Sequence, residues 1–455
     1  MVQQLSKTDR ELPRYTSANA GHLDRGLDAT RVLDSSNVHL VHRRRKQSAT
    51  VCQKSQRLEH RADSRDDKSR GKKPELRPGG RAAKNTRLMR ILRLLTLTCL
   101  MEPTIHAQDD DFPRAAEARV FSFPRDHANH PEYKTEWWYF TGTLEADDGK
   151  LFGYQATWFR SALTPRAAQR ASALGARDLY FFHGSLSDVK EQRFLFDQSV
   201  SRGVPGWAGA SAENLDVSLL ENSLRRTPDG SWRLRCRIRG RELDLELTPK
   251  RAALLHGQEP GLSQKGPLPG QASFYYSQTR LAGTGTLTRE DGSTVTVQGK
   301  TWFDHEFGSN QLTEDQVGWD WFSATLDDGS DLMLYLLRKK DGRVETTSSG
   351  TLREADRQSL HLTRDDFTVR ELEHWKSPHS GARYPAAWRI EVPGSGLSLE
   401  VRPLLPDQEL RTQGTTGVTY WEGLCEFQGR RGDRKVSGKG YVELVGYAGA
   451  FLGEI

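Results

Sequence analysis

The residues best suited to chemistry lie in one short run, residues 300–308, which read Lys-Thr-Trp-Phe-Asp-His-Glu-Phe-Gly. Its carboxylates, Asp304 and Glu306, stand among aromatic residues, and Asp320 stands between two Trp residues shortly afterwards. Burial against such rings disfavours the charged form of a carboxylate, so its pKa rises and it can donate a proton near neutral pH. We therefore take Asp304, Glu306 and Asp320 as candidate proton donors, and His305 as a further candidate catalytic residue.

Carboxylates next to Trp recur in residues 136–139, 302–306, 318–321 and 420–423. This is more Trp than a small β core requires, so these segments predict the lining of a binding site. The candidate ligand-binding residues are Glu136, Trp137, Trp138, Tyr139, His183, Trp302, Trp319, Trp321, Tyr420 and Trp421. The alternative is that the carboxylates pair with Arg160, Arg338 or backbone amides at a seam between two domains. Spacing alone favours this alternative, and it favours His183 as a hydrogen-bonded core histidine.

No cofactor or metal is expected from the motifs. In a strand, Asp304 and Glu306 share one face while His305 takes the other, so this triplet cannot bind one metal ion without a bulge. The sequence has no Cys/His cluster with zinc spacing, no His-Glu-x-x-His, no Gly-x-Ser-x-Gly and no phosphate-binding Gly-rich loop.

The elements that must position these residues are β-strands in two related domains. Residues 137–144 and 319–326 resemble each other, 182 positions apart, and each is followed by Asp-Asp-Gly and an apolar run ending in Arg. Period-two alternation, clearest in residues 232–238, 243–247 and 397–401, predicts strands with one buried face. We predict an all-β fold of two antiparallel barrels side by side, over residues 119–298 and 299–455. Small barrels leave room inside for one ligand, so the chemistry is expected among inward-facing residues.

The front of the chain differs from the rest. Residues 1–88 hold 21 Lys and Arg, 10 Asp and Glu and one aromatic, which predicts a disordered basic extension or a start codon assigned too far upstream. Residues 89–107 read as a signal peptide, so we expect an exported, periplasmic protein, not a lipoprotein, beginning near Gln108. The remainder carries 43 basic and 49 acidic residues, so no nucleic acid is expected as a partner. Cys236 and Cys425 remain, and export allows but does not require a bridge between them.

An ordered set of motifs strongly resembles the AttH-like proteins, which are relatives of the carotenoid 1,2-hydratases. The motifs are His130-Pro131, residues 136–139, 153–155, 159–160, 275–277 and 279–280, Trp302-x-Asp304-His305-Glu306, residues 318–321, Tyr384-Pro385 and residues 420–423. The resemblance covers roughly residues 121–446. It implies a tandem lipocalin-like (calycin) fold and an association with lipid or isoprenoid metabolism and with export systems.

Three functions follow as hypotheses. The first is binding of a long apolar ligand, such as a lipid or isoprenoid, in a Trp-lined cavity. The second is a hydro-lyase of the carotenoid 1,2-hydratase type, in which a carboxylic acid protonates a terminal C=C and water captures the cation. The third is an accessory subunit of an envelope lipid or export transporter. The expected partners are a hydrophobic small molecule, an ABC-type export system and a membrane surface in peripheral contact. A buried carboxylate inside the cavity favours the enzyme, and an all-apolar cavity favours the carrier.

Overall fold

The computed structural model describes residues 112–165, 175–355 and 357–451, which all lie in one compact unit, Glu102–Ile455. The extension predicted over residues 1–88 and the signal peptide predicted over residues 89–107 lie outside the described residues. No helix in the described ranges is long and apolar enough to cross a membrane. The described helices are single 3-10 turns, η1 (Arg125–His127), η2 (Arg364–Asp366) and η3 (Pro393–Ser395).

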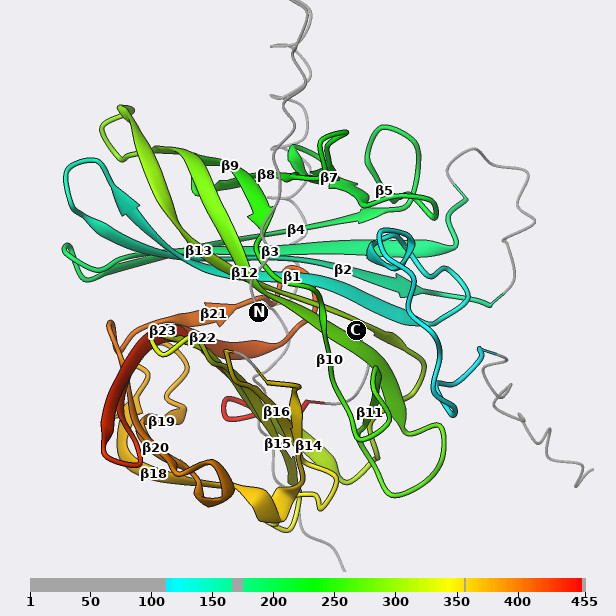
Figure 1. Cartoon of the computed structure of the whole chain (residues 1–455). Helices are drawn as coiled ribbons and strands as arrows, with labels where there is room; N and C mark the ends of the chain where they lie inside the picture. The colour runs from blue at the N-terminus through cyan, green and yellow to red at the C-terminus, as the bar shows by residue number, and fades with distance from the viewer. Residues whose placement is uncertain (1–111, 166–174, 356, 452–455) are drawn as a thin grey trace, which may run out of the picture. The chain divides into compact units, whose positions relative to one another are not determined.

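The strands form two curled antiparallel sheets (Figure 1). In order of pairing, the first sheet holds β4 (Arg193–Arg202), β3 (Asp178–Asp188), β2 (Leu151–Ala162), β1 (Thr135–Ala146), β13 (Thr294–Gly308), β12 (Ala272–Thr288), β9 (Arg241–Pro249), β8 (Trp232–Ile238), β7 (Asn222–Arg226), β6 (Asp216–Leu219) and β5 (Ala208–Ala210), with β10 (Leu254–Leu255) and β11 (Leu262–Gln264) on β12. The second holds β17 (Leu360–Leu362), β16 (Gly350–Arg353), β15 (Asp331–Lys339), β14 (Gln316–Leu326), β23 (Arg434–Val445), β22 (Thr419–Arg431), β20 (Leu397–Pro403), β19 (Arg383–Val392) and β18 (Thr368–Lys376), with β21 (Glu409–Arg411) on β22.

The two sheets share one strand order, which explains the internal repeat. β1 lies between the next strand in the chain, β2, and a late strand of its sheet, β13, and β14 lies in the same way between β15 and β23. The repeated Trp segments thus occupy equivalent places, as the sequence predicts, and the fold is all-β and lipocalin-like. The expected boundary between residues 298 and 299 falls inside β13, which pairs with β1 and β12, so the first sheet continues to Gly308.

Alternation produces these strands as expected. In β8 every second side chain is buried, from Trp232 to Ile238, while the intervening Arg side chains are exposed. Hairpin turns after β1 and β14 place Gly149 and Gly329 at φ 77° and 86°, a left-handed conformation that a residue with a Cβ adopts at a cost.

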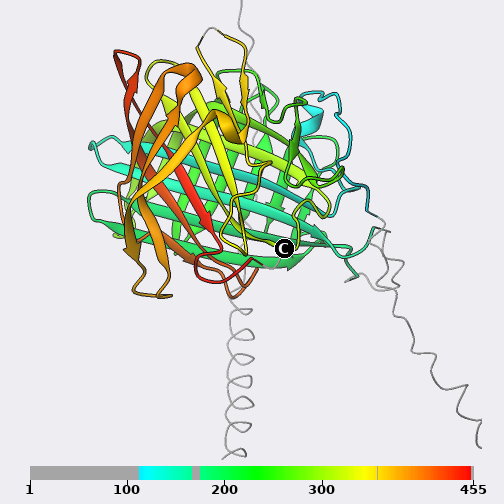
Figure 2. The same cartoon turned by 90° about the horizontal axis from the view of Figure 1, so that it is seen from below.

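Each sheet has a hydrophobic core of its own, and a third cluster lies between the sheets. The first core contains Trp138, Trp158 and Trp232, and the second contains Phe322 and Trp388. The third joins Tyr139, Tyr275 and Trp302 of the first sheet to Trp321, Tyr335 and other residues of the second. Seen from below, the second sheet (yellow to red) lies over strands of the first (Figure 2). Cys236 and Cys425 are buried in separate cores as free thiols, so no bridge joins them.

Candidate functional site

A cavity of about 880 Å³ lies between the two sheets and is lined by strands of both. Its walls include aromatic side chains of β1, β12 and β14, namely Trp137, Tyr139, Tyr275, Trp319 and Trp321. Residues 310–314 of the β13–β14 connection, which are polar except for Leu312, also line the cavity. The barrel analogy predicts a site inside one sheet's own core, and this prediction is wrong, because the cavity lies between the sheets. The cores are filled with large side chains, and the space remains where the opposite faces of the sheets meet.

Asp304 of β13 lies in the wall of this cavity and is almost completely buried. The Tyr275 hydroxyl donates to its Oδ2 at 2.5 Å, and Trp302 Nε1 donates to its Oδ1 at 2.6 Å, where the Ser277 hydroxyl also donates. In the described part of the chain, no basic side chain forms an ion pair with it. Burial raises the pKa of Asp304 to about 7, helped by the charge of Glu306 and opposed by the three hydrogen bonds. Asp304 therefore retains its proton in a substantial fraction of molecules at neutral pH.

A hydrogen-bonded relay connects Asp304 to the second sheet. Trp321 Nε1, on β14, donates to the Tyr275 hydroxyl at 3.0 Å, and that hydroxyl donates in turn to Asp304. All three side chains border the cavity. The relay fixes the direction of the carboxyl group and ties the acid to the ring that faces it from the other sheet.

Glu306, two residues along the same face, has a different environment. Its carboxylate forms an ion pair with Lys265 Nζ at 3.1 Å and accepts a hydrogen bond from Ser273 at 2.5 Å. Burial lowers the pKa of Lys265, but the adjacent Glu306 offsets this and leaves it raised, so the ammonium group stays charged. Glu306 is therefore placed as a charge partner of Lys265. The sequence analysis missed Lys265 because it lies in a Gly- and Pro-rich connection without a motif.

Two further carboxylates lie on the second sheet, Glu443 of β23 and Glu422 of β22. Glu443 lines the cavity and accepts a hydrogen bond from Trp319 Nε1 at 2.7 Å. Burial raises its pKa to about 7, and the charges of Asp304 and Glu306 add to the effect. Glu422 is fully buried and accepts a hydrogen bond from the Tyr139 hydroxyl at 2.7 Å. Glu422 belongs to the Tyr-Trp-Glu-Gly motif of the sequence. Glu443 lies in an alternating strand without a motif, so no sequence pattern indicated it as a site residue.

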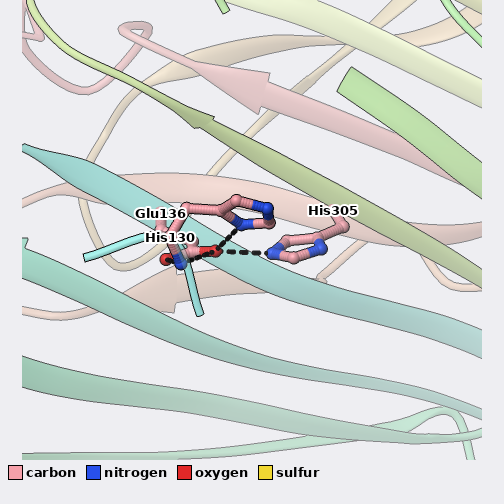
Figure 3. A group of neighbouring side chains, drawn as sticks. All are labelled: His130, Glu136 and His305. Carbon is pink, nitrogen blue, oxygen red and sulfur yellow. Dashed lines mark hydrogen bonds and ion pairs between the residues drawn. The ribbon is translucent and has the colours of Figure 1, made fainter. Parts of the chain in front are cut away.

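Strand alternation separates the remaining candidates from the cavity. Glu136, Trp138 and His305 lie on the other face of β1 and β13, in the first sheet's interior, as expected for His305. His130 Nδ1 and His305 Nε2 lie 2.9 and 2.8 Å from the same Glu136 oxygen (Figure 3). Arg160 Nε donates to the other oxygen at 3.3 Å. We call His130, Glu136, Arg160 and His305 the polar clasp.

The polar clasp contains three potential metal ligands, from His130, Glu136 and His305. Sequence reasoning did not combine them, because His305 lies 169 positions away from Glu136 in the chain. Both imidazoles are aimed at the carboxylate itself, His130 Nε2 contacts Asp126 at 3.1 Å, and His305 Nδ1 contacts the Tyr276 hydroxyl at 2.9 Å. A cation would have to break these bonds and approach a guanidinium group. The donor set therefore fits a hydrogen-bonded network better than a metal centre.

The other predicted residues serve the second sheet or the seam. Asp320 forms an ion pair with Arg338 at 2.9 Å, but the two residues lie on adjacent strands of the second sheet and not at a seam between domains, and burial raises the pKa of Asp320 to about 6. Trp421 Nε1 donates to the Pro406 carbonyl in the second core. His183 contacts the Tyr420 hydroxyl at 3.0 Å, and burial lowers its pKa to about 3. Tyr420 itself lines the cavity, and Trp302 reaches the site through Asp304.

Comparisons with known proteins concern the family and the fold. The sequence model described as AttH-like matches residues 114–447. The crystal structure of a candidate AttH protein from Nitrosomonas europaea is 35% identical, with a TM-score of 0.66, covering 72% of this chain and 98% of that one. Kievitone hydratase from Fusarium solani subsp. phaseoli is 25% identical over 250 residues, 52% of this chain and 67% of that protein. The crystal structure of kievitone hydratase from Nectria haematococca shares the fold, at 16% identity and a TM-score of 0.57, covering 75% of this chain and 95% of that one.

Proposed function

The chain belongs to the AttH-like family, and from this premise we propose that it is a hydratase-like enzyme that adds water to a carbon–carbon double bond of an apolar ligand. The observation that carries the proposal is Asp304, a buried carboxyl group with a pKa of about 7 in the wall of an aromatic cavity. A group with that pKa is protonated in about half of the molecules at neutral pH and can donate its proton. The similarity to a protein named kievitone hydratase supports the reaction class.

The reaction begins with transfer of the Asp304 proton to one alkene carbon, which leaves a carbocation on the more substituted carbon. The faces of the Trp137, Trp319 and Trp321 rings can stabilise that positive charge. A water molecule then forms a C–O bond with the cation and loses a proton to a carboxylate in the site. The net change is addition of one H and one OH across the double bond, and Asp304 regains a proton.

The cavity also supports the class of ligand. Its volume lies within the range of about 300–1,000 Å³ that accommodates small molecules. Aromatic side chains supply much of its apolar lining, beside polar and charged residues, so a long apolar molecule such as a lipid or isoprenoid is the proposed substrate. A carrier without turnover is the second candidate, favoured by the same aromatic lining.

Two measurements separate the candidates. Purified protein is incubated with an acyclic carotenoid in H₂¹⁸O, and mass spectrometry follows the gain of one labelled water. We expect labelled product from the wild type and a loss of rate of roughly 10²-fold or more in Asp304→Asn, in line with general-acid contributions. Quenching of Trp fluorescence by the same carotenoid, without any labelled product, would instead establish the carrier. If neither signal appears, both functions are wrong for this class of ligand.

A further inference from the structure

Glu422 and Glu443 are direct neighbours on adjacent strands. They are paired residues in the antiparallel register of β22 and β23, so their side chains leave the sheet on the same face. Cβ atoms of such a pair lie about 4.5–5.5 Å apart, within mutual reach of two Glu side chains. Among the described residues, each carboxylate accepts one hydrogen bond, from the Tyr139 hydroxyl for Glu422 and from Trp319 Nε1 for Glu443.

In the part of the chain that the structure describes, no basic side chain forms an ion pair with either carboxylate, and Oε2 of the fully buried Glu422 has no hydrogen-bond partner. Two carboxylates this close cannot easily ionise together, so one of them retains a proton. Burial and the charge of Glu443 raise the pKa of Glu422 well above its ordinary value, which makes Glu422 the protonated member. Glu443, which lines the cavity, is then the member that ionises first.

The position of Glu443 in the cavity also suits a role beside Asp304. Asp304 lines it from β13 of the first sheet, whereas Glu443 lines it from β23 of the second. Trp321, paired with Glu443 in the β14–β23 register, is the ring that donates to Tyr275 and so to Asp304. The acid and this second carboxylate therefore lie in walls contributed by different sheets.

We propose that Glu443 is the base that accepts the proton from the attacking water, and that Glu422 is a positioning residue that holds Glu443 in its ionised form. This inference rests on the proposed hydration. Asp304 gives a proton to the alkene carbon, the water oxygen forms the C–O bond, and one water O–H bond breaks as its proton passes to Glu443. Transfer of that proton back to Asp304 through solvent in the cavity restores both groups.

Other titratable groups lie around the pair, on its own two strands and on strands of the first sheet. They are Tyr139 of β1, Asp304 and Glu306 of β13, Tyr420 and Cys425 of β22, and Tyr441 of β23. Burial raises the pKa of each of these Tyr hydroxyls and of the Cys thiol, so they stay neutral across the working range. The pH dependence of the water-activating step therefore reports the carboxylates.

The test is the pH–rate profile for hydration of an acyclic carotenoid. For the wild type we expect a bell, whose ascending limb reports the base and whose descending limb reports Asp304. Glu443→Gln preserves an acceptor for Trp319 but cannot take a proton, so we expect it to lose the ascending limb and at least about 10-fold in kcat. Its affinity for the carotenoid, measured by Trp fluorescence, should stay within about threefold. Glu426→Gln, on β22 and outside the cavity, is the matched control and should retain the wild-type profile.

Variants of Glu422 test the positioning role. Glu422→Leu removes the neutral acid beside Glu443, so the pKa of Glu443 rises and the ascending limb should move to higher pH by about one unit. Glu422→Gln supplies a neutral polar group again and should move the limb back. Infrared spectroscopy gives a readout without turnover, because a carboxylic C=O band that persists above pH 8 in the wild type should be absent in Glu422→Gln.

Each outcome has one meaning. A wild type that hydrates the carotenoid, with an unchanged ascending limb in Glu443→Gln, would overturn the inference and leave the proposed function standing. A wild type without hydration refutes the proposed function and this role of Glu443 together. Absence of the infrared band in the wild type would show that Glu422 is ionised and would overturn its assigned role in either case.

Discussion

At the scale of single residues, the environment of a carboxylate decides its chemistry more than its sequence neighbours do. Asp304 lies two residues after Trp302, and Asp320 lies between Trp319 and Trp321. Asp320 has a guanidinium partner at 2.9 Å, whereas the described residues that donate hydrogen bonds to Asp304 are all neutral. Burial raises the pKa of both carboxyl groups, but the guanidinium group opposes the rise at Asp320, to about 6, whereas neutral donors oppose it at Asp304, to about 7.

Asp304→Asn should abolish most hydration without loss of stability. The amide oxygen can accept from Trp302 and Ser277 as Oδ1 does, whereas the Tyr275 hydroxyl, which donates to Oδ2, must turn and accept from the amide nitrogen, and the loss of this donation offsets part of the gain from removing the buried acid. Because the folded pKa of about 7 exceeds the unfolded value, wild-type stability falls as pH rises from about 4 through 7. The variant lacks this loss, so its advantage should grow with pH and reach roughly 4 kcal/mol at most. Urea unfolding at pH 5 and pH 8 measures the difference, and a variant less stable by 3 kcal/mol at both pH values would refute this account.

Glu136→Gln should have the opposite profile, with lower stability and intact ligand binding. Burial raises the pKa of Glu136, but bonds from His130 and His305 and the charge of Arg160 lower it far more, so the group is an anion in the fold. Removing its charge leaves the buried Arg160 with Asp178 as its remaining carboxylate partner, so the cost should approach but not exceed the roughly 3–5 kcal/mol of a broken buried pair. A carboxylate whose pKa is lowered by folding stabilises the folded protein at pH values above its unfolded pKa, and this stabilisation is lost as the pH falls. The stability deficit of Glu136→Gln should therefore shrink below about pH 4.

Thermal unfolding measures that deficit, and Glu145→Gln, at an exposed position of the same strand, is its control. Trp fluorescence of the surviving folded protein should still respond to an acyclic carotenoid, because Trp137 and Tyr139 lie on the opposite face of β1. A strong loss of affinity in folded Glu136→Gln would show that the polar clasp belongs to the binding site.

At the scale of elements, the two sheets repeat one close contact between their central strands. A Cβ added at Gly299 of β13 would lie 1.8 Å from the carbonyl oxygen of Thr143, and one added at Gly438 of β23 would lie 2.3 Å from that of Thr325. Thr143 and Thr325 occupy equivalent positions of the repeat, so both sheets require a residue without a Cβ here.

Gly299→Ala and Gly438→Ala should therefore each destabilise the protein by about 1–3 kcal/mol or more, because backbone must move to admit the methyl group. Gly209→Ala in β5, where an added Cβ meets nothing within 4 Å, is the matched control and should be close to wild type. Chemical denaturation compares the three variants, and equal stabilities would show that the strands separate without cost.

At the scale of the whole molecule, the seam between the sheets carries the proposed function. The cavity and the Asp304 relay use side chains from both sheets, and Glu422 of the second sheet accepts a hydrogen bond from Tyr139 of the first, so neither sheet holds the site alone. Duplication of one strand order supplied two surfaces, and their facing sides became the walls of the cavity.

Export is a prediction that belongs to the whole chain. The charged, apolar and small-residue pattern of residues 89–107 predicts cleavage after Ala107, so the exported protein should begin near Gln108. N-terminal sequencing of protein recovered from the envelope of its native host measures this. A folded, exported form that begins before residue 89 would show that the signal peptide is wrongly assigned.

The sequence by itself determined where the strands lie and which side chains share a face of each strand. Period-two alternation, Asp-Gly turns and the repeat predicted antiparallel strands in two related sheets, and placed His305 opposite Asp304 and Glu306. These features follow from local geometry, because successive side chains of a strand point to opposite faces whatever lies around them.

Only the tertiary structure decided which face carries the site. Alternation says which residues share a face, but packing of the second sheet selects the face of Trp137, Tyr139 and Asp304 for the cavity and that of Glu136, Trp138 and His305 for the core. Lys265 and Glu443 reach the site from distant segments, and no local pattern records such contacts. The pKa of each carboxylate depends on those contacts, since burial and neighbouring charge act through space and not along the chain.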